Sequence, residues 1–152
     1  MKNLREHIVE GLKIGVNTKV NTHNYHPKEA SELLNLVRQL ISERGNKADL
    51  NDIDTSEITD MSYLFYDSKF NGDISNWDVS NVTNMTDMFT HSKFNGDISN
   101  WDVSNVENMH YMFFDSMFNK DISNWDVRNV KGMDHMFYKS PLEKNPPKWY
   151  KK

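Results

Sequence analysis

The feature that most constrains this chain is a stretch of twelve residues that it contains three times. FNGDISNWDVSN occupies residues 70–81, returns unchanged at 94–105, and returns at 118–129 with Lys120 and Arg128 as its two substitutions. A fixed period of this size is the signature of a repeat architecture. A unit this short cannot bury its own apolar side chains, so equivalent copies must stack on one another.

The period continues in both directions beyond these copies. A degenerate copy, ADLNDIDTSEITDMSYLF, precedes them at residues 48–65, and Leu142 and Trp149 stand where a further copy would have Phe and Trp. We therefore predict three regions. They are an N-terminal helical segment and cap at 1–45, four 24-residue repeats at 46–141 (46–69, 70–93, 94–117 and 118–141), and a C-terminal capping stub with a basic tail at 142–152.

Eight apolar positions recur in each clean copy, and no single helical or strand period fits them all. In the first clean copy they are Phe70, Ile74, Trp77, Val79, Val82, Met85, Met88 and Phe89. The residues before Met85 are rich in Asn, Asp, Ser and β-branched types, which favours short strands and turns. We predict that these apolar positions form the core of a solenoid, while the Asp, Ser and Asn side chains hold its turns and link neighbouring coils.

The segment before the repeats has the pattern of an amphipathic helix. PKEASELLNLVRQLISERG starts with Pro27 and ends with Gly45, residues typical of a helix start and a helix stop. Its apolar stripe is expected to cover the open end of the first coil, and consists of Ala30, Leu33, Leu34, Val37, Leu40 and Ile41. A second short helix is predicted near residues 3–15, with one or two short strands after it.

Charge and composition exclude several classes of function. Residues 46–141 carry seven basic and sixteen acidic residues, which argues against binding of a nucleic-acid backbone there. No apolar run is long enough for a membrane span, and the N-terminus lacks the pattern of a signal peptide. We expect a cytoplasmic location, with the virion or the cell surface as the alternative, and no nucleic-acid or membrane partner.

The sequence offers no catalytic motif. It contains no cysteine, phosphate loop, GxSxG or HExxH, so we expect no enzyme activity, no cofactor and no metal site. The aspartates that recur at Asp73, Asp97 and Asp121 could bind calcium, although hydrogen bonding within turns explains them better. The repeated tryptophans could stack on sugars, but their coupling to the other apolar positions favours a place in the core.

The positions that differ between copies indicate where a binding site would lie. The first two clean copies are identical over twenty residues except at three positions, which hold Thr, Thr and Asp in one copy and Glu, His and Tyr in the other. Exposed aromatic residues at such positions are good anchors for a protein interface. We predict a partner-binding surface formed by Tyr63, Tyr66, His110, Tyr111, Phe114, His135 and Tyr138.

These residues also resemble those of a known family. FNGDISNWDVSNVTNMTDMF, with ADLNDIDTSEITDMSYLF and HPKEASELLNLVRQLI before it, resembles the repeat of the BspA-like bacterial surface proteins over about residues 26–149. The resemblance implies an α+β repeat protein, a leucine-rich-repeat-like right-handed solenoid of short parallel strands with an N-terminal helical cap. Many repeats of that family carry a Cys where this chain has Ser68, Ser92 and Ser116.

The expected function is that of a non-catalytic protein–protein interaction scaffold. In this hypothesis the chain is a monomer or a weak homodimer and binds a protein partner through its variable, solvent-facing residues. It could be encoded by a phage or mobile element and act as a binder, an inhibitor or a virion component. The alternative is a surface adhesin or glycan-binding module whose secretion signal the sequence does not include.

Overall fold

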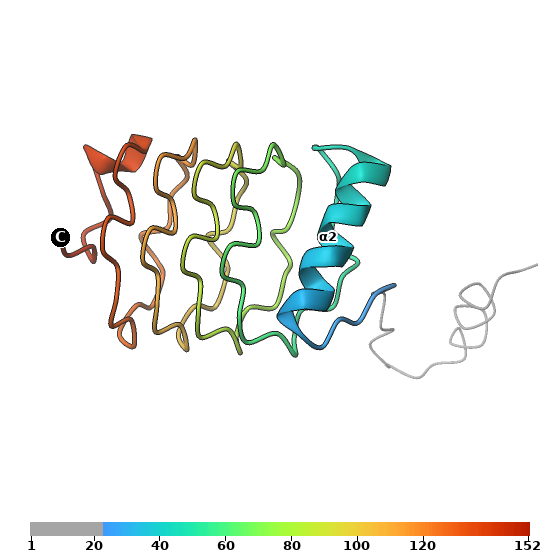
Figure 1. The fold of residues 1–152 in the computed structure, drawn as a ribbon. Helices are drawn as coiled ribbons and strands as arrows, with labels where there is room; N and C mark the ends of the chain where they lie inside the picture. The colour runs from blue at the N-terminus through green and yellow to red at the C-terminus, as the bar shows by residue number, and fades with distance from the viewer. Residues whose placement is uncertain (1–22) are drawn as a thin grey trace, which may run out of the picture.

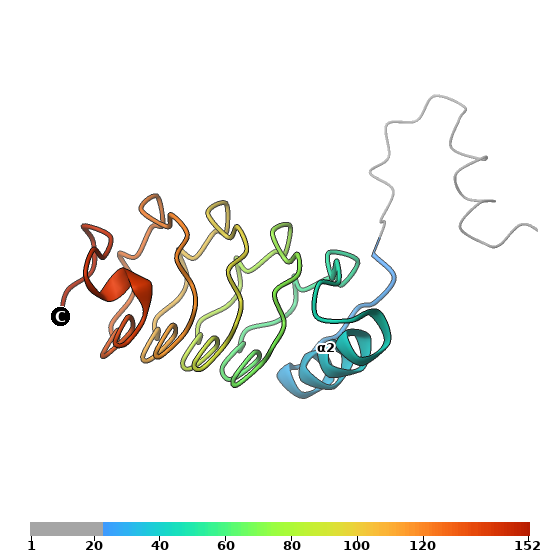
Figure 2. The same ribbon diagram turned by 90° about the horizontal axis from the view of Figure 1, so that it is seen from above.

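The computed structural model describes residues 23–152, and the short helix and strands predicted before residue 23 lie outside this part. It contains helix α2 (Ala30–Arg44) and a short 3-10 helix, η1 (Pro141–Glu143). Between them the chain winds through a row of similar coils, with α2 against the first coil and the C-terminus beside the last (Figure 1). The view from above shows the same order along the row (Figure 2).

Helix α2 covers the N-terminal end of the coils, as the apolar stripe predicts. Leu33, Val37 and Leu40 are buried, and their spacing puts them on one face of the helix. Just before the helix, the Lys28 N–H donates to the Glu32 carboxylate of its first turn at 3.2 Å. Gly45 ends the helix with a φ of 91° and donates its N–H to the Ile41 carbonyl.

Arg44, the last residue of α2, fixes the helix to the first coil. Its guanidinium donates to both carboxylate oxygens of Asp52, at 2.9 and 3.0 Å, and to the Asp49 carbonyl at 3.0 Å. The same guanidinium lies 5.9 Å from the centre of the Tyr25 ring. This pairing lowers the pKa of Asp52, and the hydrogen bond from Arg44 is the main cause.

The predicted α+β, leucine-rich-repeat-like solenoid of short parallel strands is wrong. No strand occurs in residues 23–152, where neighbouring coils meet through isolated parallel bridges such as Asp60 to Asn84 and Asn84 to Asn108. The reason lies in the backbone after each bridge. N–H groups that donate to the next coil, such as those of Tyr63 and Phe65, alternate with N–H groups that bond back within the same coil.

Left-handed residues make this alternation possible. Each coil has two non-glycine residues with positive φ, four positions apart, and the pairs are Tyr63 and Asp67, Asp87 and His91, Tyr111 and Asp115, and His135 and Lys139. A strand needs extended residues throughout. The segment therefore forms hydrogen bonds between coils like those of a sheet. Its backbone turns at each left-handed residue, so it is not extended as a strand is.

The core consists of columns of equivalent aromatic side chains. Phe65, Phe89, Phe113 and Phe137 stack with their rings within 3° of parallel, at successive centroid distances of 5.4, 5.5 and 5.8 Å. A second column joins Phe70, Phe94 and Phe118 at 6.1 and 6.2 Å. All seven rings are buried, so the repeated Phe residues are structural.

The repeated tryptophans belong to the same core. Trp77, Trp101 and Trp125 are each only 4% exposed, which leaves no ring face for a sugar. Each indole N–H donates to a carbonyl of the preceding coil, as in the bond from Trp101 to Ile74 at 3.1 Å. Trp149 continues this column, because it stacks on Trp125 and donates to the Ile122 carbonyl.

The predicted roles of the repeated polar residues in turns and between coils are confirmed. The Asp97 carboxylate accepts the Ser99 N–H and hydroxyl at 2.9 and 2.7 Å, and the Asn105 amide donates across to the Ser80 carbonyl at 2.7 Å. Such bonds from serine lower the pKa of several carboxyls, including four in the clean repeats that we call the turn aspartates: Asp73, Asp97, Asp102 and Asp121.

Candidate protein interface

Three positions of each coil carry side chains that differ between copies, and they lie where the chain takes its left-handed turns. The first column holds Tyr63, Asp87, Tyr111 and His135, the second Tyr66, Thr90, Phe114 and Tyr138, and the third Asp67, His91, Asp115 and Lys139. Residues of the first and third columns are those with positive φ. Between the first two columns lie buried residues such as Met88 and Phe89, and the column side chains other than Thr90 are at least partly open to solvent.

Ring contacts join most of these side chains into one continuous surface, which we call the aromatic strip. It consists of Tyr63, Tyr66, His91, Tyr111, Phe114, His135 and Tyr138. Across coils, Tyr111 stacks on His135 at 5.5 Å and Phe114 stacks on Tyr138 at 5.6 Å. The strip thus crosses all four coils without a break.

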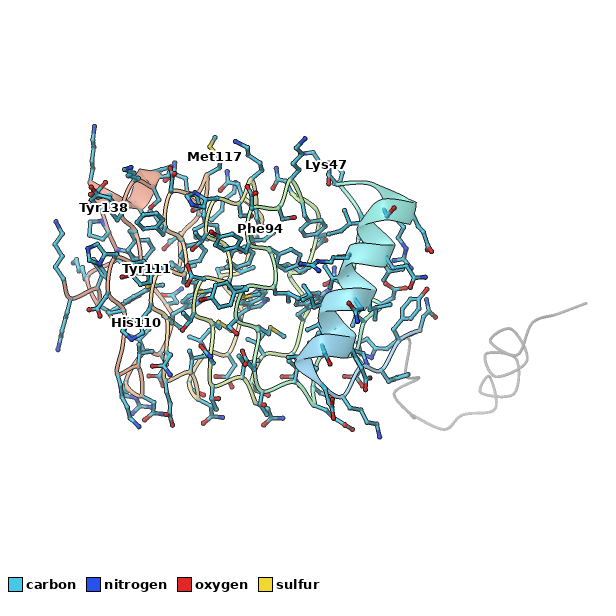
Figure 3. All side chains as sticks on the ribbon, viewed as in Figure 1. Lys47, Phe94, His110, Tyr111, Met117 and Tyr138 are labelled. Atoms are coloured by element: carbon cyan, nitrogen blue, oxygen red, sulfur yellow. The ribbon has the colours of Figure 1, made fainter. Side chains whose placement is uncertain are left out.

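The strip is open to solvent. Tyr63, Tyr66 and Tyr138 are 53%, 47% and 43% exposed, and Tyr111 is 38% exposed. Tyr111 and Tyr138 lie toward the C-terminal end of the row of coils. The exposed Met117 lies at the upper edge of the coils in the same view (Figure 3). Large apolar side chains gathered on one exposed surface mark an interaction site more often than scattered ones do.

His91 is a member of the strip that the sequence comparison missed. Its ring bridges Tyr66 and Phe114, with both centroids 5.8 Å away, because the Thr90 side chain beside it is small and buried. The comparison of copies stopped one position before the third column. That column holds Asp, His, Asp and Lys, and its variability was the available signal.

His110 is the one predicted residue that lies outside the strip. Its Nδ1 accepts the Asp134 N–H at 3.2 Å, and its ring packs against Gly132, where an added Cβ would clash with it. A glycine in the next coil therefore makes room for this imidazole. The variability of His110 reflects packing between coils rather than membership of the exposed surface.

Carboxylates accompany the rings of the strip. Asp87 lies in the first column between Tyr63 and Tyr111, and one of its oxygens accepts the Thr90 hydroxyl at 2.8 Å. Its charge, together with a hydrogen bond, raises the pKa of Tyr63. Asp115 pairs with His91 at 3.1 Å. Lys139, in the third column, lies beside the strip, with its amine 5.8 Å from the centre of the Tyr138 ring.

Beyond the strip, the features of the described residues that could indicate a function are pockets, metal-binding groups and membrane-spanning helices. An open pocket of about 350 Å³ adjoins the last coil beside His135, Tyr138 and Tyr150. Within residues 23–152, no group of three or more His, Asp or Glu side chains is arranged to hold a metal ion. Neither helix of this part of the chain has the length and apolar character needed to cross a membrane.

A family model described as "Mycoplasma protein of unknown function, DUF285" matches residues 34–149, which include most of α2, all the coils after it and Trp149. No curated protein and no solved structure matches the sequence.

Proposed function

The chain belongs to this family of Mycoplasma proteins of unknown function, and from that premise we propose that it is a non-catalytic scaffold that binds a protein partner through its aromatic strip. The family supports the prediction of a bacterial repeat protein. The resemblance to BspA-like repeats stays part of this proposal and agrees with a role in recognition.

The observation that carries the proposal is the contrast between two classes of aromatic residue. Phe65, Phe89 and Phe113 are repeated, buried and stacked, so packing explains them fully. The strip residues differ from copy to copy and are exposed or, for Phe114, partly exposed, so packing of the core does not explain them. Aromatic side chains are frequent among the residues that contribute most to binding energy in protein interfaces.

The coil stack also favours binding by holding the strip rigidly. Every second N–H beneath it bonds to the next coil, as in the bonds from Tyr111 to Asp134 and from Phe113 to Met136. A surface that is already ordered loses little conformational entropy when a partner binds. Large side chains on a fixed backbone can therefore contribute most of their contact energy to affinity.

Capture of the partner tests this function. The triple variant Tyr111→Ser, Phe114→Ser, Tyr138→Ser removes three strip rings, and Met117→Ser removes an exposed apolar side chain outside the strip. We expect a lysate protein that is retained by the wild type and by the Met117 variant and is lost by the triple variant. Equal retention by all three proteins contradicts the proposal, provided that circular dichroism shows the triple variant folded.

A further inference from the structure

The charges on the aromatic strip indicate the chemistry of its partner. We infer that the strip binds a basic, arginine-containing segment of another protein in an extended conformation, with guanidinium groups over its rings and against Asp67 and Asp87. This inference rests on the proposed function, since it names the class of partner for the same surface. Four observations support it.

The first observation is that the strip carries carboxylates without cationic partners. The ion pairs of residues 23–152 engage other acids of this region, such as Asp52, Asp54 and Asp115. No Lys, Arg or His of the described chain lies within ion-pairing distance of Asp67 or Asp87. Lys139 is the single Lys or Arg in the three columns, against three aspartates. A basic segment would complement this charge.

The second observation is the position of Asp87 relative to the rings. The backbone N–H of Asp87 donates to the next coil, so the residue is held in the row between Tyr63 and Tyr111. One carboxylate oxygen accepts the Thr90 hydroxyl, and the carboxylate also hydrogen-bonds with Tyr63, so the negative charge is held beside a strip ring. A cation placed there meets a carboxylate and the faces of aromatic rings together, and both attract it.

The third observation is that the protein already holds one arginine in this way. Arg44 pairs with both oxygens of Asp52 while its guanidinium lies over the Tyr25 ring, 5.9 Å from the ring centre. On the strip itself, the Lys139 amine lies over the Tyr138 ring, which is the same cation–ring contact without the carboxylate. Arginine suits such sites better than lysine, because its planar group both stacks on a ring and bonds two oxygens.

The fourth observation concerns length. The Phe rings beneath the strip are spaced 5.4, 5.5 and 5.8 Å apart from the first coil to the fourth. The strip is therefore about 17 Å long, which an extended peptide of about five residues would span at roughly 3.3 Å per residue. Three alternate side chains of that peptide, about 6.6 Å apart, would face the strip at nearly the spacing of its coils.

Fluorescence anisotropy tests the inference on the full chain. The probe is a fluorescein-labelled peptide, Arg-Gly-Arg-Gly-Arg, and the matched control peptide carries citrulline, which has the shape of arginine without its charge. We expect the arginine peptide to bind and the citrulline peptide to bind at least about tenfold more weakly. Raising the salt from 50 to 300 mM should weaken arginine binding, because exposed charges are then screened.

Two variants with the same change in net charge locate the contact. Asp87→Asn should weaken arginine binding by about fivefold, within the range of a single cation–π and ion-pair contact. Asp102→Asn lies outside the strip and should change it less than twofold. Asparagine keeps an oxygen that can accept the Thr90 or Ser104 hydrogen bond, so both variants should fold.

Several results would overturn the inference. They are no binding of the arginine peptide, equal binding of the citrulline peptide, and equal losses in the two aspartate variants, which would indicate attraction by net charge alone. A captured partner that depends on the strip but resists high salt and lacks a basic segment would also contradict it. That last result would contradict this inference but not the proposed function. Capture of a partner equally well by the wild type and by the triple strip variant would contradict the proposed function itself.

Discussion

Replacing Phe113 by alanine, and comparing the result with Tyr111→Ala, separates the core from the strip. Phe113 is fully buried, and its ring lies 5.5 Å from Phe89, 5.8 Å from Phe137 and 4.3 Å from Phe118. Truncation of a buried Phe to Ala costs roughly 3–5 kcal/mol. Because three rings lose a stacking partner, we expect about 4 kcal/mol, within that range.

Tyr111 is only two residues away but has a different environment. It is 38% exposed and contacts Phe114 and His135 on the strip. Two partly solvated ring contacts are together worth about 1 kcal/mol, so Tyr111→Ala should cost no more than about 1.5 kcal/mol. The difference between the two variants should therefore exceed about 2 kcal/mol.

Urea unfolding followed by tryptophan fluorescence measures both values, since Trp77, Trp101 and Trp125 are buried in the native state. The dependence of the unfolding free energy on urea should have the same slope in wild type and variants if unfolding remains two-state. A loss in Tyr111→Ala as large as that in Phe113→Ala would refute the reasoning. The strip would then be part of the core rather than a surface free for binding.

Three further predictions concern stability. Gly72→Ala should destabilise the protein by about 1–3 kcal/mol, because its Cβ would strike the backbone carbonyl of Ala48 as well as the Phe70 ring. Gly96→Ala should cost less than Gly72→Ala but still destabilise, because its closest contacts are with the buried Phe94 ring; urea unfolding compares the two variants. Arg44→Gln should lower the melting temperature and increase hydrogen exchange in α2, since Asp52 would lose its bidentate partner. The turn aspartates have a lower pKa in the folded protein than the ordinary value of 3.8, so they stabilise the fold fully above that pH. This stabilisation is lost as the pH falls through their folded pKa, and an unchanged melting temperature between pH 6 and pH 2.5 would contradict the prediction.

Sequence alone predicts the core of this protein well. A position that is invariant between copies and apolar, such as that of Phe70 and Phe94, is buried in the structure. Helix α2 (Ala30–Arg44) also carries clear signals, because Pro27 lies shortly before its apolar stripe and Gly45 directly after it. Both predictions rest on patterns that repeat or persist over many residues.

The strand prediction failed because the sequence gives little sign of its left-handed residues. Glycine adopts positive φ most readily, but here Asp, Tyr and His occupy such positions, as at Asp87 and Tyr111. Hydrogen bonds to the next coil and the packed rings beneath stabilise these conformations. Such stabilisation comes from contacts between coils, which a local sequence window does not contain.

The sequence predicts most residues of the strip, but it wrongly includes His110 and leaves out His91. Variability identified Tyr111 and Tyr138 correctly as exposed, yet it also included His110, whose neighbour Gly132 lies one coil later. His91 was missed because the comparison of copies stopped one position before its column, which varies as Asp, His, Asp and Lys. Only the ring contacts to Tyr66 and Phe114 place it in the surface.

The central claim is that the variable, exposed face of the coils binds the partner while the repeated residues build the scaffold. Backbone amide NMR shifts, recorded as the captured partner is added, test it most directly. The account predicts shifts concentrated at Tyr66, His91, Phe114 and Tyr138, in four successive coils. Shifts confined to the Asp–Ser turns around Ser75 and Ser99, with the strip unchanged, would contradict it.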